Sequence, residues 1–206
     1  KEPAVEKVEM LGSLRRKVVT IGDVDLAVAT KNPDKVMKHI LLFSGIKKVL
    51  YSGPKKTMFI HTYGRQVDVK TQEPASFGSM LQHYTGSKLH NIHLRTYALE
   101  KGMSLSEHGI KHKGKLKTFV DEESFYKYLG LDFIPAEIRE DTGEIETAKN
   151  GSLPELIEID DVRGDLHIHT NVEIASSHDQ GSSSVKELLL EGQKLGYEYI
   201  GFTDHN

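Results

Sequence analysis

Short runs of branched apolar residues, bounded by glycines and other turn residues, fill the first part of the chain and predict strands. These runs lie at residues 8–11, 23–28, 47–51, 57–63 and 66–70. Asn32 and Pro33 predict the start of a helix, because asparagine caps helix N-termini and proline suits the first helical position. Apolar residues three or four positions apart give this helix a buried stripe, and Gly45 ends it. Residues 1–73 are therefore expected to form a small α/β unit.

The pattern from Glu73-Pro74 onward predicts a second, α+β unit over residues 74–139. One helix ends near Gly86, and Ser87 caps the next, which runs to Lys101. A hairpin of strands 105–111 and 115–119 and a short helix over 122–129 follow. Residues 140–163 are acidic with little periodicity and are expected to form a linker.

The last segment, residues 164–206, has the pattern of a strand, a helix and a second strand. Ser184 and Glu187 have the spacing of a capping box at the start of the helix, and Gly196 ends it. One βαβ unit of this kind is too small to be stable alone.

Composition and charge narrow the class of protein. The chain of 206 residues is 37% hydrophobic and contains no cysteine, which excludes a disulfide framework and zinc-finger chemistry. It has neither a long apolar run nor a secretory leader, so a cytoplasmic protein without membrane contact is expected. Residues 1–120 hold 21 Lys and Arg against 10 Asp and Glu, whereas residues 121–206 hold 6 against 20. Such a division suggests a polyanion-binding part joined to an acidic part; two solvated faces of opposite charge are the alternative.

Asp23 and Asp25 stand two residues apart on a predicted strand, so their side chains face the same way. Carboxylates held side by side repel each other unless a cation lies between them, and oxygen ligands suit Mg²⁺. Asp68, in another predicted strand, could complete a two-metal site. The simpler alternative to a metal site is that these acidic residues lie at strand ends and are exposed to solvent. The Gly12-Ser13 turn and the arginines after it favour the functional interpretation, because they could bind phosphate oxygens.

Three motifs resemble one known family. GSLRRKVVTIGDVD resembles the palm signature of nucleotidyltransferases, and of family X DNA polymerases in particular. HYTGSKLHNIHLRTYALEKGMSLSEHGI resembles the thumb of that family, and YKYLGLDFIPAEIRE resembles the end of that thumb. The resemblance covers residues 8–139 and implies a palm with a mixed sheet over 1–73 and a thumb over 74–139.

In the palm, the resemblance implies that Asp23 and Asp25 bridge two Mg²⁺ or Mn²⁺ ions. Asp68 would bind the catalytic ion and help to ionise the primer 3′ hydroxyl. Gly12, Ser13 and Arg16 would hold the triphosphate, where Arg16 stabilises charge on the leaving pyrophosphate. Lys17 stands where the family usually has glycine, and Gln66 stands where some members have arginine.

In the thumb, Tyr84 and Gly86 would line the sugar of the incoming nucleotide. Asn91 would reach the minor-groove edge of the new base, Arg95 would reach the template, and Lys88 would contact DNA. Without the resemblance, Asn91 and Arg95 would be an ordinary pair on a helix surface.

Histidines mark the final segment. His167 and His169 stand two apart on a predicted strand, and Asp204-His205 follows the second strand. The sequences DLHIHT and YIGFTDH resemble the opening of the PHP (polymerase and histidinol phosphatase) domain, a βα barrel. The resemblance implies Zn²⁺ or Mn²⁺ at His167, His169 and His205 and a phosphoesterase or 3′→5′ exonuclease activity. Asp179 lies in a loop that departs from the family pattern, and residues 164–206 alone are expected to hold no complete site.

The resemblance implies template-directed, gap-filling DNA synthesis for repair, with gapped or primer–template DNA and a dNTP as partners and no obligate protein partner. Nucleotidyl transfer to a non-DNA acceptor and DNA binding without catalysis are the alternatives. The chain begins with Lys1 and ends with Asn206, and it is expected to be part of a longer protein.

Overall fold

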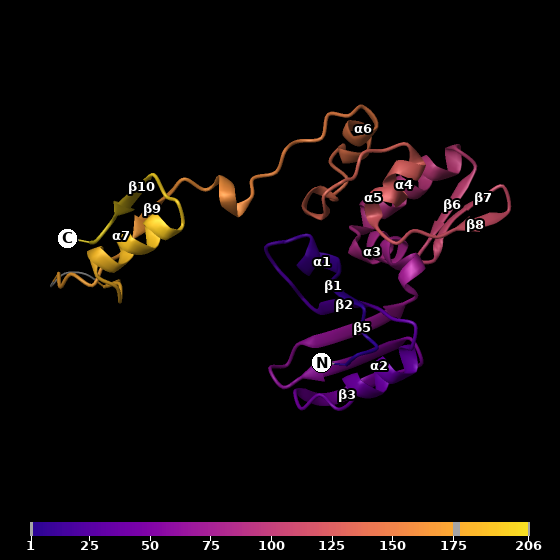
Figure 1. Ribbon diagram of the computed structural model, residues 1–206, viewed down its shortest axis with the longest axis horizontal. Coiled ribbons are helices and arrows are strands. Elements are labelled where there is room, and N and C mark those ends of the chain that lie inside the picture. The colour runs from indigo at the N-terminus through magenta and orange to yellow at the C-terminus, as the bar shows by residue number, and fades with distance from the viewer. Residues whose placement is uncertain (1, 175–177, 206) are drawn as a thin grey trace. The chain divides into compact units, whose positions relative to one another are not determined.

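The computed structural model describes residues 2–174 and 178–205 (Figure 1). The chain divides into two compact units, Lys1–Leu153 and Pro154–Asn206. Among the described residues, no helix is long and apolar enough to cross a membrane.

The first unit contains a five-stranded sheet, and all five strands correspond to runs expected from the sequence. The strand order is β1 (Lys7–Met10), β2 (Val24–Ala29), β5 (Gln66–Gln72), β4 (Lys56–His61) and β3 (Ile46–Ser52). β2 and β5 are parallel and the other pairs are antiparallel, so the sheet is mixed, as the resemblance implies.

Side chains alternate between the two faces of β2, and each face meets a different helix. Val28 points to α2 (Pro33–Ile40), where it packs with Val36 and Met37. Ala27 and Ala29 point the other way, toward α1 (Gly12–Arg15) and α3 (Phe77–Thr85). Asp25 shares this second face, because it precedes Ala27 by two residues. The predicted cap is confirmed, since the Asn32 side chain accepts a hydrogen bond from the Lys35 amide.

The following elements form a second core within the same unit. They are the 3₁₀ turn η1 (Pro74–Ser76), α4 (Lys88–Glu100), β6 (Met103–Ser106), β7 (Gly109–His112), β8 (Lys115–Lys117) and α5 (Glu122–Leu129). Leu94, Phe125 and Tyr126 lie in its centre. The sequence predicted two strands where the structure has three, because the chain turns between Ser106 and Gly109 and pairs β6 with β7.

The prediction of an unstructured linker over residues 140–163 is wrong for the first part of that segment. After η2 (Ala136–Ile138), α6 (Glu144–Lys149) packs onto the second core, where Ile145 and Ala148 are buried (Figure 1). Only these two apolar residues face inward, so the helix shows almost no apolar periodicity in the sequence. The first unit extends to Leu153.

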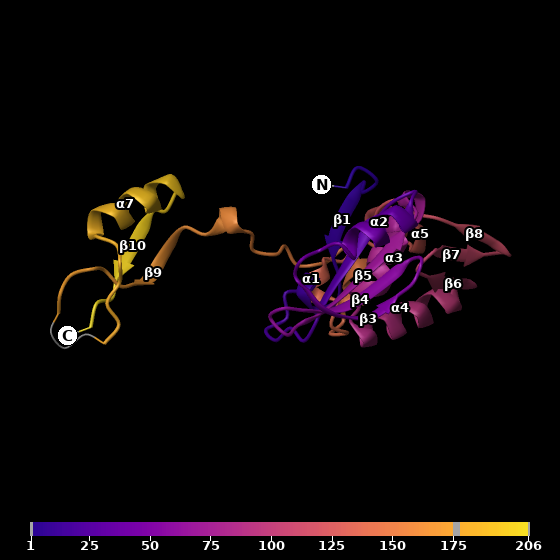
Figure 2. The ribbon, with the colours of Figure 1, turned by 90° about the horizontal axis from the view of Figure 1, so that it is seen from below.

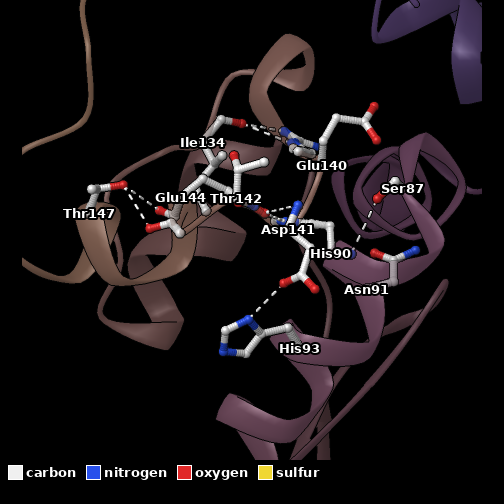
Figure 3. A network of polar contacts seen from close by, with 12 residues as sticks. Ser87, His90, Asn91, His93, Ile134, Glu140, Asp141, Thr142, Glu144 and Thr147 are labelled. Atoms are coloured by element: carbon white, nitrogen blue, oxygen red, sulfur yellow. Dashed lines mark hydrogen bonds and ion pairs between the residues drawn. The ribbon is translucent and has the colours of Figure 1, made fainter.

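A buried polar network ties α6 to α4 (Figure 3). The completely buried His90 lies with Nδ1 2.6 Å from Oε1 of Glu144 and Nε2 3.0 Å from the Tyr126 hydroxyl. The Glu144 carboxylate also accepts hydrogen bonds from the amides of Asp141 and Thr142. Burial lowers the pKa of His90. Burial also opposes the charge of Glu144, but its hydrogen bonds outweigh this and hold its pKa at about 2. The pair therefore consists of a neutral imidazole that donates from Nδ1 to a carboxylate.

The second unit is the predicted βαβ unit. β9 (Gly164–Ile168) and β10 (Tyr199–Phe202) pair in parallel, and α7 (Val185–Lys194) connects them (Figure 2). The capping box of Ser184 and Glu187 is formed. The short η3 (Ile159–Asp161) precedes β9.

We predict that the first unit loses stability in mild acid through His90. Because the pKa of His90 is lower in the folded chain than in the unfolded chain, the unfolded chain binds more protons as the pH falls below about 6.5. Denaturant unfolding at pH 7.0 and 5.5 should show this loss, and His90→Gln should reduce it. The control His93→Gln changes an exposed side chain on the same helix and should keep the loss. Equal pH dependence in the wild type and in His90→Gln would contradict the prediction.

Candidate active site

Asp25 and Asp68 lie side by side because β2 and β5 run parallel with these two residues in register. Asp68 is buried, with 6% of its surface exposed, and Asp25 is partly buried. Asp23 is exposed and occupies the bend directly before β2. The prediction that Asp23 belongs to the strand is wrong, because the pairing of β2 with β5 begins at Val24.

A lysine lies between the two carboxylates. Nζ of Lys70 is 2.8 Å from Oδ1 of Asp25 and 3.8 Å from Oδ2 of Asp68. Lys56 lies 3.1 Å from Asp68, and Nε2 of Gln66 donates to Oδ1 of Asp68 at 2.8 Å. These positive and polar groups offset the repulsion between the carboxylates. Sequence reasoning missed Lys70, although residues 66, 68 and 70 alternate along one strand and so share a face.

The donor set fits a divalent cation. Asp25 and Asp68 both lie within 4 Å of the same ammonium group, so a positive charge is already stabilised between them. Carboxylate oxygens are the ligands that Mg²⁺ and Mn²⁺ prefer, and Asp23 could add a third carboxylate from the edge of the site.

Gly12 and Ser13, predicted as a turn between strands, form the start of the single-turn helix α1, and this glycine-serine turn lies against Asp25. The Leu11 amide donates to the Asp25 carbonyl at 2.9 Å, which attaches the turn to β2. Gly12 has a φ of +57°, and a Cβ at this position would lie 3.1 Å from Oδ2 of Asp25. Glycine is needed here both for its backbone conformation and for the close approach.

Arg16 connects this turn to the end of α3. Its Nη1 donates to the Thr85 carbonyl at 2.6 Å, and its Nε donates to Oε1 of Glu140 at 2.6 Å. Gly86 has a φ of +72°, and a Cβ there would lie 3.2 Å from Nη1 of Arg16. The structure thus brings together Arg16 and Gly86, two predicted nucleotide-binding residues 70 positions apart.

Arg15 makes a more deeply buried connection. It donates to the Thr85 hydroxyl at 2.7 Å and to Glu122 at 2.5 Å, and Arg139 binds the other oxygen of Glu122 at 2.6 Å. Burial disfavours the charge of Glu122, yet the two arginines hold its pKa below the usual value. Sequence reasoning missed this arrangement, because Arg15 and Glu122 are 107 residues apart.

Tyr84 lies next to the carboxylate pair. Its ring is 4.9 Å from Nζ of Lys70, and both side chains line a cavity that Glu107 and His108 also reach. Burial raises the pKa of Tyr84.

Lys88, Asn91 and Arg95 share one side of α4, because they are spaced by three and four residues. The Asn91 amide is bound within the protein, since Nδ2 donates to the His83 carbonyl and Oδ1 accepts from Gln82, both at 2.8 Å. Arg95 is exposed, with Nη2 3.3 Å from the His83 ring. Lys88 is exposed in the first turn of the helix.

The histidines of the second unit also gather. Ligand atoms of His169, Asp179 and His205 all lie within 4.8 Å of one another. Nε2 of His167 is 3.1 Å from Nε2 of His169, and His178 stacks on His205. Imidazole nitrogens with a carboxylate suit Zn²⁺ or Mn²⁺. Of the three histidines predicted as metal ligands, His169 and His205 belong to this group and His167 does not; the structure adds Asp179, which the loop pattern left open.

A mixed sheet that presents paired carboxylates beside a glycine-serine turn, followed by an α+β unit that contacts this turn, is a polymerase beta-like palm and thumb. The family model of the DNA polymerase beta thumb matches residues 80–140. The DNA polymerase/3'-5' exonuclease PolX of Bacillus subtilis (strain 168) is 39% identical over 204 residues, which are 97% of this chain. Both matches support the family X DNA polymerases as the family of this chain, which spans about a third (34%) of the length of this relative.

We predict that Gly12→Ala weakens divalent metal binding at the carboxylates. The new methyl group would lie 3.1 Å from Oδ2 of Asp25, so the carboxylate must shift slightly, and the left-handed backbone adds a cost of about 1 kcal/mol. Gly64→Ala is the matched control, since Gly64 has a φ of +81° with nothing within 4 Å of its Cβ position. Both variants should lose similar stability in denaturant unfolding, whereas only Gly12→Ala should weaken Mn²⁺ binding in a calorimetric titration. Unchanged Mn²⁺ affinity in Gly12→Ala would contradict this contact.

Proposed function

We propose that this chain carries the site for template-directed DNA synthesis by two-metal nucleotidyl transfer. The main support is the register of β2 and β5, which aligns Asp25 with Asp68 beside the turn that bears Arg16. The Bacillus subtilis relative is named a DNA polymerase, which supports the same function for the complete protein.

In this proposal, each part of the site has a distinct role. Asp23, Asp25 and Asp68 would hold two divalent ions, which when bound would lower the pKa of the primer 3′ hydroxyl and neutralise charge on the triphosphate. The amides and hydroxyl of the Gly12-Ser13 turn orient the triphosphate.

Lys70 has to leave the space between Asp25 and Asp68 before an ion is bound there. Its long side chain allows this movement, and Tyr84 offers its ring as an alternative contact for the ammonium group. Arg16 stays beside Gly86, where it offers a guanidinium group to the phosphates.

Basic side chains of the thumb support a nucleic-acid partner. In the described part of the chain, no ion pair engages the lysines of the β7–β8 region and α5. These are Lys111, Lys113, Lys115, Lys117 and Lys127. They are available for DNA phosphates, whose binding depends on charge and on salt. Lys88 and Arg95 on α4 would add contacts with DNA.

We predict that Asp68→Ala abolishes gap filling. The loss of one carboxylate from the metal site removes several kcal/mol of transition-state stabilisation, so incorporation should fall at least about 100-fold. A gap-filling assay with Mg²⁺ or Mn²⁺ measures this, and binding of gapped DNA should survive. Asp34→Ala, which changes an exposed acid on α2, is the control.

Other outcomes of this assay would favour the alternatives. Nucleotide transfer that needs no DNA would favour a non-DNA acceptor. Binding of gapped DNA by a wild-type chain that incorporates no nucleotide would favour a non-catalytic DNA-binding fragment.

We also propose that the second unit contributes part of a metal site for phosphodiester hydrolysis. The cluster of His169, Asp179 and His205 supports this role, and the relative is named a 3'-5' exonuclease. We predict that His169→Ala weakens Mn²⁺ binding to the Asp68→Ala chain by about tenfold or more, because an imidazole ligand is lost. His39→Ala, an exposed histidine of the first unit, should leave the affinity unchanged. Calorimetric titration measures both, and equal affinities would contradict the site.

A further inference from the structure

Three consecutive basic residues after the glycine-serine turn each meet a different carboxylate of the thumb. Arg15 binds Glu122 at 2.5 Å, Arg16 binds Glu140 at 2.6 Å, and Lys17 binds Glu137 at 2.8 Å. These contacts connect the candidate triphosphate site to residues far along the chain.

The environments of the three pairs differ. The Arg15 pair is mostly buried and shares Glu122 with Arg139, so it holds the two parts of the unit together. The Lys17 pair is exposed, with 76% of the lysine side chain accessible, and such pairs contribute little. Arg16 is only 13% exposed, whereas Glu140 is 40% exposed at the rim.

The contacts of Arg16 occupy two of the three nitrogens of its guanidinium group. Nε is bound to Glu140 and Nη1 to the Thr85 carbonyl. Nη2 makes no hydrogen bond recorded among the described residues, so this donor remains available to a phosphate oxygen. Gly86, without a side chain, leaves Nη1 room to approach the backbone.

Glu140 is itself held firmly. Directly before it, the buried Arg139 donates to Glu122 and to the Ile134 carbonyl, and its own carbonyl accepts from the Ser87 amide. Directly after it, the amides of Asp141 and Thr142 are bound by Glu144 (Figure 3). The backbone around Glu140 is therefore fixed on both sides, which limits where its carboxylate can lie and allows it to orient the Arg16 side chain.

We propose that Glu140 is a positioning residue that aims Arg16 at the triphosphate of the incoming nucleotide. This inference rests on the proposed function. Glu140 does not touch the nucleotide; it fixes Nε of Arg16 so that Nη2 points to the phosphates without a loss of side-chain freedom on binding.

The test compares Glu140→Gln with Glu137→Gln, a matched change in the neighbouring ion pair. Glu140→Gln should raise the KM for dNTP in primer extension about tenfold, with kcat changed less than about twofold, because a charge-assisted hydrogen bond is weakened. Glu137→Gln should change neither value. Glu140→Asp, which keeps the charge, should recover part of the loss, and thermal melts of all three variants check the fold.

A second measurement separates this inference from the proposed function. Equilibrium binding of the fluorescent nucleotide mant-dATP with Ca²⁺ requires no turnover, and Glu140→Gln should weaken it about tenfold. In an Arg16→Lys background, the same change should have no further effect.

An unchanged KM and unchanged mant-dATP affinity in Glu140→Gln would overturn the positioning role of Glu140. Primer extension by the wild type would still support the proposed function. A lower KM would also overturn it, since Glu140 would then compete with the phosphates for Arg16. If the wild type extends no primer, the proposed function fails, and mant-dATP binding alone decides the role of Glu140.

Discussion

The site depends on the alignment of two carboxylates on one face of a sheet. The parallel pairing of β2 and β5 sets Asp25 opposite Asp68, and like charges so close together require a cation. In this structure Lys70 meets that requirement, with Lys56 and Gln66 at the second carboxylate. The same geometry makes the face suitable for divalent ions, because the protein has already arranged its negative charge around one position.

The rest of the fold brings the proposed phosphate-binding groups to that face. Ala27 and Ala29 are small, so α3 packs closely on the sheet beside the carboxylates. Gly12 and Gly86 have no side chains. A side chain at position 12 would push the turn away from Asp25, and one at position 86 would push Arg16 away from the end of α3. Small residues therefore lie where elements of the fold approach each other closely, and the side chains of Asp25 and Arg16 fill the space that the two glycines leave.

One buried carboxylate fixes how the thumb joins the palm, and another holds α6 to α4. Glu122 is shared by Arg15 and Arg139. Glu144 accepts hydrogen bonds from the neutral His90 and from two amides. Removing one partner from such a group leaves an uncompensated charge, so these groups allow few alternative arrangements. Glu140 and Glu144 lie in the segment that follows the thumb, so an apparently featureless acidic stretch is connected to Arg16 and to α4.

The sequence by itself determined the local structure and much of the chemistry. Helix caps at Asn32, Ser87 and Ser184 and the five strands of the first sheet are visible there, because capping and strand alternation are short-range effects. Its motifs also identified the family. Only the tertiary structure decided which distant groups meet: Lys70 between the carboxylates, Glu140 on Arg16, and α6 on the second core. These contacts arise from the register between strands and from buried charges that must find partners. No periodicity in the sequence encodes them, since their members are separated by up to 124 residues.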